Sequence, residues 1–149
     1  MKHKHHKMKA ETRYITFDGA TFVYPEDAEH YEIMRRLQVK RNLLADMVGH
    51  FSRQIHSVRD NITRTEKYLH EINGLFQDPE FLHTRDHVAA MSNRMQQRIK
   101  LKRYQDELKS IKQMLAKLNP ELSHTDNLIR QRTVDHDEVV FQRTQLKQQ

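Results

Sequence analysis

The sequence predicts a mainly α-helical protein with an N-terminal β-hairpin, a long antiparallel coiled-coil helical hairpin and a C-terminal helix. An apolar stripe at alternating three- and four-residue spacing runs from Met34 to Phe76, and so long a 3.5-residue repeat is typical of a coiled-coil seam. Only 36% of the 149 residues are hydrophobic and 31% are charged, which favours exposed helices with narrow buried seams over a compact core. Two β-branched and aromatic runs flank Asp18-Gly19, which is typical of a β-hairpin.

The N-terminal region divides into a basic Lys/His tail over residues 1–12, which resembles an expression tag, and the hairpin over residues 13–25. With a two-residue loop, Ile15 lies opposite Phe22, and Phe17 shares their face. An isolated hairpin is marginally stable in water, so we expect these three side chains to dock on another surface. That surface is either the protein's own helices or the sheet edge of a partner.

The first long helix is expected over residues 26–76. Pro25 suits a helix start and the acidic residues after it suit the positive end of the helix dipole, whereas Asn73-Gly74 weakens the other end. Arg41 and Thr65 interrupt the apolar seam. The seam residues that we expect in this helix are Leu37, Leu44, Val48, Phe51, Ile55, Val58, Ile62, Leu69 and Ile72.

The second helix is expected over residues 80–118, because Asp78-Pro79-Glu80 combines a cap with a helix start. The turn is short, so this helix returns antiparallel to the first and completes a helical hairpin over residues 26–118. Reflection about the turn brings Leu69 near Val88. The stripe slips near Ile99, and the seam residues that we expect are Val88, Met91, Met95, Leu108, Ile111 and Leu115.

A further cap-and-start signal, Asn119-Pro120-Glu121, predicts a kink or a break before a last helix, so residues 119–149 form a separate C-terminal element. Its apolar stripe is interrupted by Arg132, His136 and Arg143. We therefore expect the stability of this helix to depend more on contacts with its surroundings than that of the other elements.

Several classes of protein are disfavoured by what the sequence lacks. It has no cysteine, hence neither disulfides nor thiolate metal sites, and no apolar run near the roughly 20 residues of a membrane span. Its N-terminus has no apolar core of a secretory signal. We find no glycine-rich phosphate loop, serine elbow or HExxH pattern, and His83 with His87 is too small a set for a metal site. We expect a cytoplasmic protein that is not an enzyme and has no cofactor or metal.

These observations predict a non-enzymatic coiled-coil interaction protein, a structural or adaptor subunit of a larger assembly. Its protein partners, including further copies of itself, would bind through the seam and the hairpin. The alternative is a nucleic-acid-binding or packaging protein, because the net charge is +6 and basic groups favour phosphate contacts. The residues of this alternative, besides the tail, are Arg94, Arg98, Lys100, Lys102 and Arg103.

Overall fold

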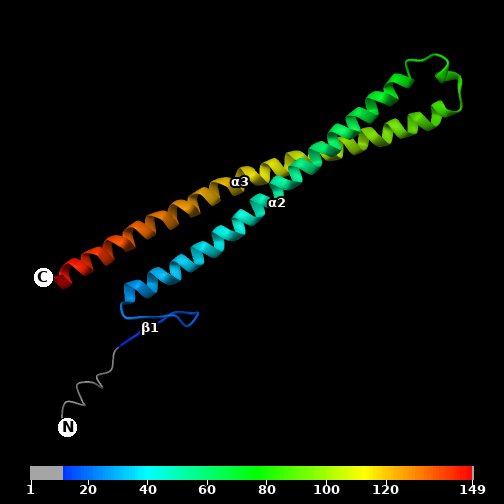
Figure 1. The fold of residues 1–149 in the computed structure, drawn as a ribbon. Helices are drawn as coiled ribbons and strands as arrows, with labels where there is room; N and C mark the ends of the chain where they lie inside the picture. Colours follow the sequence, from blue (N-terminus) through cyan, green and yellow to red (C-terminus); the bar gives the residue numbers. More distant parts are fainter. Residues whose placement is uncertain (1–11, 149) are drawn as a thin grey trace, which may run out of the picture. The chain divides into compact units, whose positions relative to one another are not determined.

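A computed structural model describes residues 12–148 of the chain, which are mainly helical. A two-stranded antiparallel sheet precedes two long helices (Figure 1). The elements are β1 (Tyr14–Ile15), β2 (Thr21–Phe22), α2 (Pro25–Leu75), a short 3₁₀ helix η1 (Phe81–His83) and α3 (Asp86–Gln148). All but the last residue of the expected tail lies outside the described residues.

The chain divides into two compact units. The hairpin unit, residues 12–44 and 121–148 of the described chain, contains the sheet, the start of α2 and the end of α3. The turn unit, residues 45–120, contains the rest of both helices and the segment that joins them. Within each unit, segments of α2 and α3 pack against each other: Arg41 pairs with Asp126 in the hairpin unit, and Tyr68 bonds to Asn93 in the turn unit.

The two short strands pair one residue away from the register that the sequence predicts. Tyr14 lies opposite Phe22, and Ile15 lies opposite Thr21, so the expected pairing of Ile15 with Phe22 is wrong. A shift of one residue moves a side chain to the other face of a strand. Phe22 therefore shares its face with Tyr14, and Ile15 lies on the opposite face.

The hairpin loop explains this shift in register. The Thr16 N–H donates to the Ala20 carbonyl at 2.8 Å, and the Gly19 N–H donates to the Thr16 carbonyl at 3.0 Å. Gly19 has φ 85°, and no described non-glycine residue has positive φ. The expected type I′ turn needs positive φ at Asp18 as well. The loop is instead a three-residue type I turn closed by a glycine bulge, which demands the left-handed region only at Gly19.

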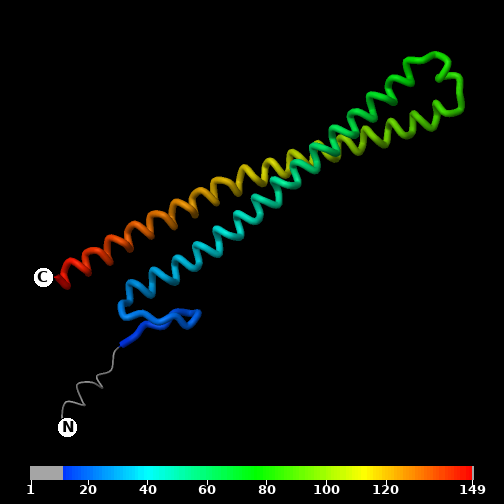
Figure 2. The backbone as a smooth tube through the Cα atoms, viewed as in Figure 1, coloured from blue at the N-terminus to red at the C-terminus, as the bar shows by residue number. Residues whose placement is uncertain are grey.

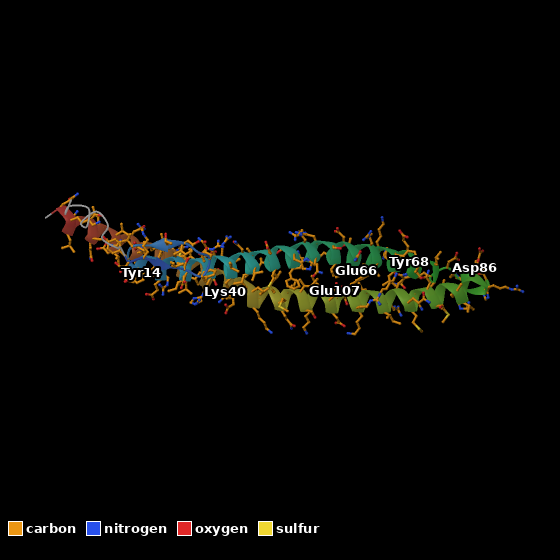
Figure 3. All side chains as sticks on the ribbon, turned by 90° about the horizontal axis from the view of Figure 1, so that it is seen from below. Tyr14, Lys40, Glu66, Tyr68, Asp86 and Glu107 are labelled. Atoms are coloured by element: carbon orange, nitrogen blue, oxygen red, sulfur yellow. The ribbon has the colours of Figure 1, made fainter. Side chains whose placement is uncertain are left out.

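The segment between α2 and α3 is longer than expected, because α3 begins at Asp86 rather than near residue 80. Figure 2 shows the chain reversing there. The Phe76 ring packs edge-on against Phe81, with ring centroids 5.8 Å apart. On α3, the Asn93 amide donates to the Tyr68 hydroxyl at 2.8 Å; Tyr68 and Asp86 are labelled in Figure 3. The longer turn shifts α3 along α2 relative to the residue alignment that reflection about a short turn predicts.

Helix α3 is continuous through Pro120. The expected separate helix over residues 119–149 is therefore the last part of α3. Proline inside a helix lacks the N–H that would bond four residues back, and its ring crowds the preceding turn. The surrounding helix overrides this local signal.

Candidate functional site

The predicted seam residues of α2 lie along a partly buried face of the helix. All nine expected residues are buried or half-buried, and Val58, Leu69 and Ile72 are the most buried of them. Thr65 is buried as well, and its hydroxyl donates to the Asn61 carbonyl at 2.7 Å, which satisfies its polar atom. This face of α2 packs as one narrow stripe.

The seam of α3 differs from the prediction in its first half. Leu108, Ile111 and Leu115 are buried or half-buried as expected. Val88 and Met95 are each 65% exposed, and Met91 is exposed too, so these three side chains do not belong to the buried face of α3 within the described chain. The half-buried positions there are His87, Ala90, Asn93, Arg94, Gln97, Leu101 and Tyr104.

This error has a simple origin in the sequence. Counting back from Leu108 in steps of seven gives Leu101 and Arg94, so the repeat continues without a slip. Apart from Leu101, its residues toward the start of α3 (Ala90, Arg94 and Gln97) are small or polar, whereas another row of α3 is apolar. A search for hydrophobic residues alone therefore selects the wrong row.

Arg94 occupies its half-buried position through an aromatic contact. Its guanidinium carbon lies 4.0 Å from the centroid of the Phe76 ring, a geometry in which the cation is attracted to the ring face. This residue is thus part of the packing of the turn unit.

The hairpin is held to α2 mainly by polar contacts. Phe22 packs against Tyr31 with ring centroids 5.3 Å apart, and the Tyr31 hydroxyl donates to the Asp18 carboxylate. Ile15 and Phe17 are 71% and 64% exposed. Of the three residues expected to dock, only Phe22 does so within the described chain, because the shifted register turns Ile15 outward.

The carboxylate of Asp18 has two hydroxyl donors. Thr16 donates to it at 2.6 Å, and this bond, followed by that of Tyr31, lowers the pKa of Asp18. The Phe17 N–H donates to the Glu32 carboxylate at 3.1 Å. These bonds fix the loop on the first turns of α2.

A charged cluster joins the start of α2 to the end of α3 in the hairpin unit. Arg143 donates to Asp27 at 3.0 Å and to Glu26 at 2.6 Å, and its guanidinium carbon lies 3.7 Å from the centre of the Tyr24 ring. The hydrogen bond from Arg143 is the largest cause that lowers the pKa of Asp27. Charge-assisted bonds of this kind are stronger than neutral ones.

Two histidines complete this charged cluster. The rings of His30 and His136 stack with centroids 3.9 Å apart, and His136 Nε2 lies 2.8 Å from Asp27 Oδ1. Burial, and next the neighbouring His136, lower the pKa of His30. The sequence showed His136 and Arg143 only as interruptions of an apolar stripe. Asp27 and His30 continue the α2 repeat toward the N-terminus. Their positions in this repeat were the signal that they would face α3.

We expect the thermal midpoint of unfolding to fall as the pH is lowered from 7 to 5. Folding lowers the pKa of His30 below its ordinary value of 6.5, so the unfolded chain binds more protons than the folded chain as the pH drops through this range. Asp27 adds a second loss at more acid pH, because its stabilisation disappears as its lowered folded-state pKa is passed. The measurement is the midpoint by circular dichroism at several pH values.

The matched variant is His30→Phe, which keeps an aromatic ring beside His136 and removes the titrating group. Its midpoint should depend less on pH between 7 and 5 than that of the wild type. Equal slopes in the two proteins would show that His30 does not carry the effect.

The basic residues of the nucleic-acid alternative do not form one face. Arg98, Lys100, Lys102 and Arg103 are exposed, whereas Arg94 packs on Phe76. Arg98 and Lys102 are four residues apart and share a side of α3, and Lys100 and Arg103 lie on other sides.

No group of His, Asp or Glu side chains within residues 12–148 is arranged to hold a metal ion. None of the helices in this range has an apolar stretch long enough to cross a membrane. The expected lack of a cofactor stays a prediction. Function is inferred from the chain's own surfaces, since no family model, no curated protein and no solved structure matches it.

Proposed function

We propose that the chain is a non-enzymatic coiled-coil interaction protein, a structural or adaptor subunit of a larger assembly. In this proposal the paired helices form an antiparallel coiled coil, and the exposed apolar side chains bind protein partners. The function requires no catalytic group, because the helices act by holding and presenting surfaces.

The observation that supports this proposal most directly is the small amount of buried apolar surface. Among the described residues, five hydrophobic side chains are buried: Val58, Leu69, Ile72, Ile111 and Leu118. Large apolar side chains are exposed on the hairpin and on both helices. Single exposed apolar residues are ordinary, but aligned ones mark interaction sites.

The hairpin supplies one such surface in the hairpin unit. Ile15 and Phe17 project from it without burial against the described chain, although the strand and loop that carry them are fixed by hydrogen bonds to one another and to α2. A rigidly held apolar pair loses little conformational entropy on binding. This pair is therefore suited to contact a partner.

The test is affinity capture from a native extract, with and without nuclease, followed by mass spectrometry. We expect a discrete set of proteins that survives nuclease. A chain with Ile15→Ser and Phe17→Ser should lose part of this set and keep its helicity, because both side chains are exposed.

A control with Val134→Ser and Phe141→Ser removes apolar surface of similar exposure from α3; this separates the hairpin's role from a general loss of hydrophobicity. Loss of the captured proteins after nuclease treatment would favour the nucleic-acid alternative. A monomeric chain that retains no protein at all would contradict both.

A further inference from the structure

The exposed face of α3 in the turn unit carries a continuous apolar row. Val88, Met91, Met95 and Ile99, which we call the outer row, follow one another at three- and four-residue spacing and therefore lie on one side of the helix. All four are exposed. The row covers about three helical turns, or roughly 16 Å at 1.5 Å per residue, which matches the length of a short helical segment of a partner.

The outer row has a hollow at its centre. A depression of about 300 Å³ is lined by Met91, Ser92, Arg94, Met95 and Arg98. Its two methionines are flexible and polarizable, so they adapt to an inserted side chain. The Arg94 side of the hollow is fixed by the contact with Phe76, which gives this part of the surface a preformed shape.

The outer row is flanked by positive charge. Between residues 85 and 103 the sequence carries six basic residues and one acidic residue. Arg98 and Lys102 lie on the same side of α3 as the row and are exposed. Lys102 has an ion pair with Asp106 at 3.8 Å, and a pair this exposed is weak, so Lys102 is able to pair with another carboxylate.

We propose that the outer row, with Arg98 and Lys102 beside it, binds an acidic amphipathic helix of a protein partner. This proposal rests on the proposed function and names the surface and the chemistry of the partner. Apolar side chains of the partner helix at i, i+3, i+4 and i+7 would lie along the row, one of them in the hollow. Glu or Asp beside them would pair with Arg98 and Lys102, which steers association and sets orientation.

The charge and composition of this face favour an acidic helix over three other occupants, which are a second copy of the chain, a nucleic acid and a membrane surface. A second copy of the same face would place Arg98 and Lys102 against like charges, which is unfavourable. A nucleic acid needs phosphate-binding charge, but the centre of this face is apolar. A membrane-surface helix usually carries Trp, Phe or Leu on its apolar side, and the outer row has none of these.

The test uses a fluorescein-labelled synthetic peptide of about 18 residues, long enough to form a marginal helix, with Leu at i, i+3, i+4 and i+7 and Glu on both flanks. Two matched peptides carry Lys in place of Glu, or Ser in place of Leu. Binding to the full chain is followed by fluorescence anisotropy at low and at near-physiological salt. We expect the Leu/Glu peptide to bind at least tenfold more tightly than either control.

Three variant chains locate the binding. A chain with Met91→Ser and Met95→Ser should lose at least tenfold in affinity for the Leu/Glu peptide. Met114→Ser, an exposed methionine elsewhere on α3, should leave affinity unchanged. Arg98→Glu with Lys102→Glu should weaken binding and reduce its salt dependence. Circular dichroism of each variant shows whether the helices are retained.

Several outcomes would overturn the proposal. They are equal binding of the three peptides, no binding of the Leu/Glu peptide, or an equal loss with Met114→Ser. Tighter binding of a DNA oligonucleotide or of anionic lipid vesicles, unaffected by the Met91 and Met95 substitutions, would also overturn it. Proteins captured through the hairpin despite any of these results would leave the proposed function standing, so the two failures are distinguishable.

Discussion

Replacing Ile111 by Ala should lower the free energy of unfolding by about 2–3 kcal/mol, whereas replacing Ile99 by Ala should change it by less than about 0.5 kcal/mol. Ile111 is 6% exposed and Ile99 is 62% exposed. Both lie on α3 in the turn unit, so the two substitutions differ mainly in burial. Ile111→Ala removes buried methylenes from the seam and leaves a space that the neighbours fill only in part. Urea unfolding followed by circular dichroism measures both values.

This pair of variants also decides between two positions of the α3 seam. If the stripe slipped near Ile99, as the hydrophobic pattern suggests, Ile99→Ala would be costly too. Equal losses at the two positions would therefore contradict the continuous repeat that places Leu101 and Arg94 in the seam. Leu118→Ala, at another buried position of the same repeat, should resemble Ile111→Ala.

Replacing Pro120 by Ala should raise the free energy of unfolding by about 1–3 kcal/mol. Pro120 lies well inside α3, where proline costs about 3 kcal/mol relative to alanine because it lacks the N–H donor and crowds the preceding turn. Alanine restores that donor. The expected result is a higher midpoint of urea or thermal unfolding, with helicity unchanged or slightly increased.

The control for this prediction is Pro25→Ala. Pro25 is the first residue of α2, a position where the missing N–H has no intrahelical partner in any case, so its replacement should have little effect. If Pro120→Ala behaved like Pro25→Ala, Pro120 would also stand at a helix start. That result would restore the separate C-terminal helix that the cap-and-start signal predicts.

The two helices differ in how well their patterns could be interpreted. On α2, apart from Thr65, the buried positions are occupied by large apolar residues, so hydrophobicity and heptad position agree. On α3 they disagree, because Ala90, Arg94 and Gln97 hold half-buried positions while the outer row is apolar. An exposed apolar row and a buried face on one helix produce two competing stripes, and hydrophobicity alone does not distinguish them.

The charged cluster could not be predicted because its members are remote in sequence. Asp27 and His30 belong to the start of α2, and His136 and Arg143 to the end of α3. His136 and Arg143 are polar interruptions of an apolar stripe on α3, and Asp27 and His30 precede the apolar stripe of α2. Only the antiparallel packing of the two segments brings them within hydrogen-bonding distance, where burial lowers the pKa of His30 and Arg143 lowers that of Asp27.

The sequence by itself determined the helical class, the α2 seam, the hairpin at Asp18-Gly19 and the antiparallel return, because each depends on a local pattern or on the period of one helix. Tertiary structure decided the hairpin register, the continuity of α3 through Pro120 and the face of α3 that packs. These depend on free-energy differences of a few kcal/mol between alternatives that all satisfy local rules. The glycine-bulge loop and its contacts with α2 select the hairpin register, and packing between the two helices selects the rest.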